Sequence, residues 1–99
     1  KIGTYSLALA ASAHGVPFYI VAPLSTFDIS TDHGSEIEIE QRERNELAVF
    51  GGKQLLPEDA GVWNPAFDVT PSSLITAIIC EKGVILSPDT EAILSVINR

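Results

Sequence analysis

The sequence is poor in cysteine, in basic residues and in long apolar runs. It has one cysteine and no methionine, and six lysine and arginine residues stand against thirteen acids, which gives a net charge of −7. The single Cys80 excludes an internal disulfide and fits a reducing compartment, so we expect a cytoplasmic protein. Nucleic acid is not expected as a partner, because phosphate backbones are bound by basic patches. No segment approaches the roughly 18 to 20 apolar residues of a membrane span, so we expect no membrane partner.

The acidic charge is concentrated between Asp28 and Glu46. This segment has seven acids and two bases, a net charge of −5, which leaves −2 for the rest of the chain. We interpret the run as a solvated acidic face or loop, with an acidic recognition site as the alternative. His33 has no second ligand residue at a metal spacing, so we expect it to be exposed to solvent.

The first quarter of the chain predicts a helix followed by a buried strand. Thr4–Ala13 is rich in alanine, and His14 and Gly15 mark its end. Phe18–Ala22 is a continuous apolar run, typical of a strand buried on both faces of a parallel sheet. We therefore predict an α/β fold, part of a Rossmann-like domain with a mainly parallel sheet flanked by helices. Leu24–Asp28 would follow the strand at its carboxyl end, where open α/β sheets place ligands.

The middle of the chain alternates between short elements. Glu36–Glu40 has a period of two and predicts a strand, whereas Gln41–Val49 predicts a helical turn. Gly51-Gly52-Lys53 predicts a turn and lacks the full pattern of a phosphate-binding loop. Gln54–Leu56 predicts a further short strand, and Gly61–Trp63 predicts the end of another.

The last third predicts two helices around a strand. Thr70 is a good N-cap and precedes a proline, so we predict a helix over residues 71–82 that ends at Gly83. Cys80 falls in this predicted helix beside apolar neighbours, which indicates an inert, packed thiol. Val84–Leu86 predicts a strand. Ser87, also followed by proline, predicts the cap of a final helix.

Two specific motifs and a looser segment between them carry a resemblance that extends over essentially all 99 residues. Val62–Pro71 reads Val-Trp-Asn-Pro-Ala-Phe-Asp-Val-Thr-Pro, Lys1–Tyr5 reads Lys-Ile-Gly-Thr-Tyr, and Pro17–Pro23 forms the next strand. They resemble the family shared by methylthioribose-1-phosphate isomerases, ribose-1,5-bisphosphate isomerases and the regulatory subunits of the exchange factor for translation initiation factor 2. Ala22–Asp28 is similar to the methylthioribose branch, because it lacks the lysine that the other branches more often carry there.

The resemblance implies an aldose–ketose isomerase that converts 5-methylthioribose 1-phosphate to 5-methylthioribulose 1-phosphate in methionine salvage. It further implies a homodimer that uses no cofactor, neither metal nor nucleotide. The family's catalytic cysteine and aspartate would precede Lys1, so residues 1–99 are expected to be a C-terminal fragment without catalytic residues. Cys80 is not the catalytic cysteine.

Lys1 is the one substrate-binding residue that the resemblance implies, since it matches the lysine of the family's substrate-contacting Asn-Lys pair. The amides of Gly3 and Thr4 are expected to add donors at this helix N-terminus. The Asn64, Phe67 and Asp68 side chains have two interpretations. They either shape a turn, fill the core and support the Thr70 cap, or lie at the rim of the sugar-phosphate site or at a subunit contact.

Two other functions remain open. The first is a regulatory subunit of the translation initiation exchange factor, which binds a sugar phosphate or nucleotide without catalysis. The second is a generic Rossmann-like binding module, although no Gly-x-Gly-x-x-Gly follows any predicted strand. The residues that precede Lys1 in the longer protein would distinguish an isomerase from a regulator.

Overall fold

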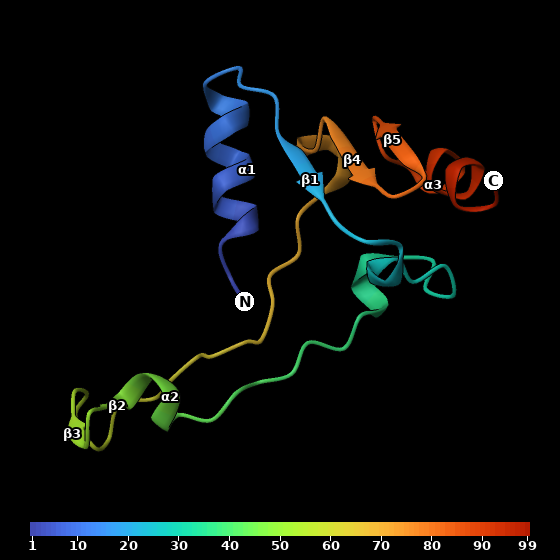
Figure 1. The fold of residues 1–99 in the computed structure, drawn as a ribbon. Coiled ribbons are helices and arrows are strands. Elements are labelled where there is room, and N and C mark those ends of the chain that lie inside the picture. The colour runs from blue at the N-terminus through green and yellow to red at the C-terminus, as the bar shows by residue number, and fades with distance from the viewer.

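The computed structural model describes all 99 residues, and its elements are spread along an elongated shape (Figure 1). The principal extents are 52 × 33 × 23 Å and the radius of gyration is 17.2 Å, against about 13 Å for a compact domain of this length. The helices and strands in chain order are α1 (Thr4–Ala13), β1 (Tyr19–Val21), α2 (Asn45–Ala48), β2 (Val49–Phe50), β3 (Lys53–Gln54), β4 (Ala77–Cys80), β5 (Gly83–Leu86) and α3 (Thr90–Ile97).

The main sheet has three strands in the order β1-β4-β5. β1 runs parallel to β4 with Ile20 opposite Ile78, and β4 runs antiparallel to β5 with Ile78 opposite Ile85. The α/β class is thus confirmed, as are α1 and the parallel strand after it. These three strands nevertheless form a mixed sheet instead of the expected mainly parallel one.

The helix predicted over residues 71–82 is wrong. Pro71 is extended, a single 3₁₀ turn covers Ser72–Leu74, and the chain then enters β4. The segment is rich in β-branched residues, which favour strands, and β1 and β5 satisfy its backbone on both sides. The apolar residues of this segment come in adjacent pairs, a pattern that fits one face of a helix and also a strand buried on both faces. Pairing with β1 and β5 makes the segment a strand. Cys80 therefore ends a strand.

Gly83 makes the turn between β4 and β5. It was expected to end a helix, but it begins β5 opposite Cys80. Its φ of +132° is a conformation that side chains rarely adopt, so glycine suits the position. The strand predicted over Val84–Leu86 is confirmed.

The final helix is confirmed, but its cap is Asp89 and not Ser87. The Oδ1 atom of Asp89 accepts a hydrogen bond from the Ala92 amide at 2.7 Å. Asp89 has the extended backbone of an N-cap, whereas Ser87 lies at a φ of +44°. Proline thus precedes the cap instead of following it.

Residues 37–70 form an arm that leaves the sheet, reaches α2 and the β2–β3 hairpin, and returns (Figure 1). The expected turn at Gly51–Lys53 is confirmed, and part of the expected helical turn is present as α2. The strands expected at Glu36–Glu40 and Gly61–Trp63 are wrong, and the strand expected at Gln54–Leu56 is reduced to Gln54 at the end of β3. These segments lack neighbouring strands, and their β-pairing is limited to an isolated bridge between Gln41 and Pro65.

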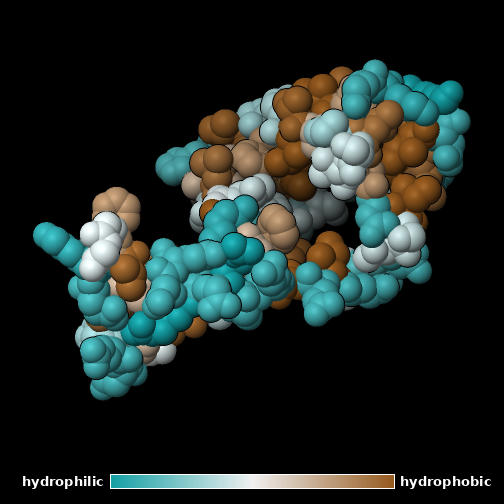
Figure 2. Space-filling view, turned by 60° about the horizontal axis from the view of Figure 1, so that its bottom comes forward, coloured by the Kyte–Doolittle hydropathy of each residue, from teal (hydrophilic) through white to brown (hydrophobic).

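Few side chains are buried. The apolar core consists of small residues with two larger ones: Ala8, Ala48, Ala66, Ala77, Ile85 and Val96. Val21 of β1 is 79% exposed, so the expectation of a strand buried on both faces fails for this chain. Figure 2 shows hydrophobic atoms gathered on the larger part of the molecule that holds the sheet. None of the helices is long and apolar enough to cross a membrane.

Candidate functional site

Lys1 lies against the return side of the arm. Its Nζ atom donates hydrogen bonds to Asn64 Oδ1 and, at 2.7 Å, to the backbone oxygen of Pro65. These contacts join residues more than sixty positions apart, so the Lys1 motif and the Val62–Pro71 motif meet in space. The structure therefore brings together two of the motifs on which the family resemblance is based.

Asn64 is the buried polar residue at the centre of these contacts, with 2% of its surface exposed. Its Nδ2 atom donates to the backbone oxygen of Glu43 at 3.1 Å and to Glu46 Oε2 at 3.3 Å. Its backbone oxygen accepts from the Arg42 amide at 2.7 Å. Asn64 thus connects Lys1 to both sides of the arm, so its role extends beyond shaping a turn.

Glu46 and Arg42 form an ion pair behind Asn64, with 2.7 Å between Arg42 Nη2 and Glu46 Oε1. The hydrogen bond from Arg42 lowers the pKa of Glu46 below its ordinary value, and a hydrogen bond from Asn64 and the charges of Arg42 and Lys1 act in the same direction. The same pairing raises the pKa of Arg42. The Glu46 carboxylate is therefore ionised and paired with the Arg42 guanidinium.

Asp68 caps helix α1. Its Oδ2 atom accepts hydrogen bonds from the Gly3 and Tyr5 amides, each at 3.0 Å. These bonds, first from Gly3 and then from Tyr5, hold the pKa of Asp68 below its ordinary value. The expectation that the Gly3 amide is open to substrate is corrected, because Asp68 occupies it. The alternative in which Asp68 supports a Thr70 cap is also wrong, since no helix begins there.

A sequence signal for this cap exists but was missed. The N-cap position of α1 is Gly3, which has no side chain to accept from the first amides of the helix. A helix start without its own acceptor leaves its first amides to water, to a ligand or to a side chain from elsewhere in the chain. Asp68 supplies it from the distant motif.

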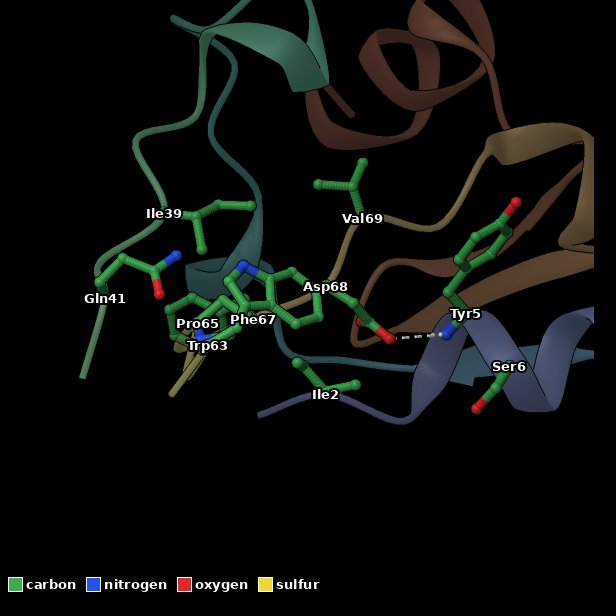
Figure 3. Close-up of a pocket in the computed structure, with 10 residues that line it drawn as sticks. All are labelled: Ile2, Tyr5, Ser6, Ile39, Gln41, Trp63, Pro65, Phe67, Asp68 and Val69. Carbon is green, nitrogen blue, oxygen red and sulfur yellow. Dashed lines mark hydrogen bonds between the residues drawn. The ribbon is translucent and has the colours of Figure 1, made fainter. Parts of the chain in front are cut away.

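A cavity of about 420 Å³ lies beside Asp68 (Figure 3). Apolar and aromatic side chains dominate its lining, which consists of Ile2, Tyr5, Ser6, Ile39, Gln41, Trp63, Pro65, Phe67, Asp68 and Val69. Phe67 is 59% exposed, so the interpretation of Phe67 as a core residue is wrong. The cavity joins the beginning of α1 to both sides of the arm.

The loop after β1 belongs to a different part of the molecule. Leu24–Thr26 forms a 3₁₀ turn, and the Leu24 amide donates to Glu81 Oε2 at 2.7 Å. Asp28 accepts from the Ser30 hydroxyl at 2.6 Å and the Thr31 hydroxyl at 2.7 Å, which lowers its pKa. Asp28 also lines a cavity against α3 that shares no residue with the cavity beside Asp68. The structure does not bring this loop to Lys1.

His33 and Cys80 lie outside both groups. His33 is exposed, as expected. Cys80 is half-buried at the end of β4, a different element from the predicted helix. No three histidine, cysteine, aspartate or glutamate side chains lie close enough together to hold a metal ion.

The fold and the joined motifs place the chain in a known class. Residues 1–87 match the sequence model of the Initiation factor 2 subunit family, so the chain belongs to that family. The chain is 56% identical over 93 residues to the methylthioribose-1-phosphate isomerase of Caldicellulosiruptor saccharolyticus, a match that covers 94% of this chain and 27% of that protein. It is also 56% identical over 99 residues to the Exiguobacterium sibiricum protein of the same name, covering 100% of this chain and 28% of that protein.

Two solved structures are similar to the whole chain. The 5-methylthioribose 1-phosphate isomerase of Pyrococcus horikoshii OT3 aligns with a TM-score of 0.90 and 44% identity, over 99% of this chain and 27% of that one. The delta subunit of translation initiation factor eIF-2B from A. fulgidus aligns with a TM-score of 0.90 and 41% identity, over 100% of this chain and 29% of that one. The family resemblance seen in the sequence is confirmed. The chain spans less than a third of each of these proteins.

Proposed function

We propose that residues 1–99 are the C-terminal portion of the Rossmann-like domain of a methylthioribose-1-phosphate isomerase, called the parent enzyme below. The identity of 56% to two curated isomerases, over nearly all of this chain, carries the proposal. The reaction converts 5-methylthioribose 1-phosphate to 5-methylthioribulose 1-phosphate. After the ring opens, hydrogen moves between C1 and C2, so substrate and product have the same atoms and no outside oxidant is consumed.

In this proposal the chain contributes to substrate binding and not to proton transfer. A cysteine and an aspartate that precede Lys1 in the parent enzyme move the hydrogen, in a site shielded from water and without a metal or nucleotide cofactor. Lys1 binds the phosphate of the sugar, since an ammonium is a compact point charge suited to phosphate oxygens. Cys80 takes no part in the reaction.

The parent enzyme is proposed to be a cytoplasmic homodimer with no nucleic-acid or membrane partner. The many exposed apolar side chains support a larger assembly, since the chain leaves Val21, Phe50 and Trp63 each more than three-quarters exposed. Monomeric proteins seldom expose large contiguous apolar patches. The rest of the parent enzyme and its second subunit would cover them.

The second candidate is a regulatory subunit of the translation initiation exchange factor, which binds a sugar phosphate or nucleotide without catalysis. The TM-score of 0.90 to the eIF-2B delta subunit favours it at the level of fold. That score equals the one for the isomerase structure, so shape does not separate the two candidates. Sequence identity favours the isomerase, since it is 56% to the curated isomerases, while the two solved structures differ little, at 44% for the isomerase and 41% for the subunit.

The deciding experiment is an isomerase assay on the parent enzyme. Purified protein is mixed with 5-methylthioribose 1-phosphate, and the ketose product is followed by ³¹P and ¹³C NMR, with and without EDTA. We expect turnover that EDTA leaves unchanged, and no turnover by the 99-residue chain alone. Loss of activity in EDTA would contradict the cofactor-free mechanism, and a parent protein that binds sugar phosphate without converting it would favour the regulatory alternative.

A further inference from the structure

The Lys1 ammonium forms no salt bridge with a carboxylate. Its Nζ atom donates to an amide oxygen and a backbone oxygen, both of which are neutral. Both salt bridges in the chain belong to Arg42 instead. An ammonium has three donors, so two fixed bonds leave one for a ligand. A flexible lysine that is already held in place loses less entropy when it binds an anion.

The acceptor that holds Lys1 is itself fixed in one orientation. The Asn64 amide nitrogen donates to the Glu43 backbone oxygen and to Glu46. A reversed amide would turn its NH₂ group toward the Lys1 ammonium and its oxygen toward two acceptors, so both sides would lose hydrogen bonds. Because Asn64 is 2% exposed, water cannot replace those bonds. The position of the Asn64 oxygen is thus determined by the arm.

Arg42 accounts for the absence of a carboxylate partner on Lys1. Glu46 lies on the far side of Asn64, and Arg42 binds its Oε1 atom through two nitrogens, at 2.7 and 3.0 Å. The remaining oxygen of Glu46 accepts from Asn64. Its carboxylate thereby orients the amide without pairing with Lys1.

We propose that Asn64 is a positioning residue that holds Lys1 Nζ for the phosphate of the substrate, an inference that rests on the isomerase function proposed above. Asn64 does not touch the substrate. It places the ammonium and, being neutral, leaves its charge available. An aspartate at this position would accept the same hydrogen bond but neutralise the ammonium that the phosphate requires.

The test is a double-mutant cycle in the parent enzyme with inorganic phosphate as the probe. Asn64→Ala, Asn64→Asp, Lys1→Met and the combination of Asn64→Ala with Lys1→Met are assayed for kcat, KM and the inhibition constant of phosphate. We expect each single variant to raise KM and the inhibition constant about tenfold to a hundredfold, the range for losing a hydrogen bond to a charged group, with kcat retained. Asn64→Ala should add little in the Lys1→Met background, because it acts through Lys1.

Asn45→Ala is the matched control, since Asn45 is an exposed asparagine of the same arm with no side-chain hydrogen bond to another residue. It should leave both constants unchanged. Asn64→Asp preserves the size of the side chain and provides a second variant if Asn64→Ala fails to fold. Full additivity in the cycle, or an unchanged inhibition constant in a folded Asn64 variant, would overturn the inference.

A second measurement separates this inference from the isomerase function. Lys1 is labelled with an amine-reactive reagent and quantified by mass spectrometry, with and without inorganic phosphate. We expect phosphate to protect Lys1 in the wild-type protein and in Asn45→Ala but not in Asn64→Ala, whether or not the protein turns over the sugar. Protection that survives Asn64→Ala would refute the positioning role. Protection together with absent turnover would refute only the isomerase function.

Discussion

The carboxylate of Asp68 accepts the backbone N–H of Tyr5 at 3.0 Å, across 63 positions of sequence. The same oxygen accepts from Gly3, so one side chain of the Val62–Pro71 motif caps the helix that follows Lys1. A negative charge at a helix N-terminus is favourable both for the helix dipole and for the unpaired amides. This contact and the one from Lys1 to Asn64 join the two motifs, and residues of both motifs line the cavity shown in Figure 3.

The Asp68 cap predicts acid sensitivity of helix α1. Its pKa is lowered from an ordinary value of 3.8 by the bonds from Gly3 and Tyr5. A depressed pKa in the folded state stabilises the fold above pH 3.8, and this contribution is lost as the pH falls through the folded-state pKa. Asp68→Asn should therefore lower the unfolding midpoint at pH 7 and flatten its dependence on pH below 4. Thermal unfolding followed by circular dichroism measures both effects.

The control for this prediction is Asp59→Asn in the arm, an exposed carboxylate without a side-chain hydrogen bond. It should shift neither the midpoint nor its pH dependence. An acid transition of the same shape in wild type and Asp68→Asn would show that the cap does not contribute in solution.

Asp89 and Thr70 are both of residue types that commonly cap helices, yet only Asp89 caps one. Asp89→Ala removes the 2.7 Å bond to the Ala92 amide and should lower the free energy of unfolding by about 0.5 to 2 kcal/mol. Thr70→Ala removes no cap and should change it by less than about 0.5 kcal/mol. Urea unfolding at one chain concentration compares the two. A larger loss for Thr70→Ala would restore the helix that the sequence predicts at Pro71.

Ile85 is the one large side chain that is fully buried, with 1% of its surface exposed. Ile85→Val removes a single methylene and should cost about 0.5 to 1.5 kcal/mol of unfolding free energy. Val84→Ala removes two methyl groups from a residue that is 53% exposed and should cost less than about 0.5 kcal/mol. The smaller truncation should thus have the larger effect, and the reverse order in urea unfolding would mean that Val84 is buried by association in solution.

Cys80 should be dispensable for chemistry. It is half-buried at the end of β4 and paired across the hairpin with Gly83. Cys80→Ser in the parent enzyme should keep kcat within about twofold, because exchanging a thiol outside the reacting groups leaves transition-state stabilisation intact. Cys80→Ala serves as the second variant. A loss of a thousandfold or more in both would place Cys80 in the reaction.

The isolated 99-residue chain should self-associate. β1 and β5 are the two edges of the sheet, and Val21 and Leu86 on these edges are 79% and 68% exposed. Unpaired apolar edges promote association. Val21→Lys should reduce the sedimentation coefficient at high concentration, whereas Val16→Lys, which adds the same charge in a loop, should not. A monomer at all concentrations would contradict this prediction.

The sequence by itself determined the elements whose signals are local. Helix α1 and its end at Gly15, the hairpin turn at Gly51, the strand after Gly83 and the final helix all depend on residues within a few positions of one another. Propensity, glycine at positive φ and apolar spacing act over that range. Family membership could also be inferred from the sequence, because complete family motifs occur along it in their expected order.

The tertiary structure determined those features of the fold that depend on residues distant in sequence. The segment after Pro71 is a strand because β1 and β5 pair with it, although its local cap and spacing favour a helix. Glu36–Glu40 alternates like a strand but finds no strand to pair with. The contact of Lys1 with Asn64 has no local signal, and the glycine at the N-cap of α1 shows only that a local acceptor is absent, not that Asp68 supplies one to Tyr5. These hydrogen bonds join residues more than sixty positions apart, so they form only when the folded chain brings the return side of the arm back to the N-terminal residues.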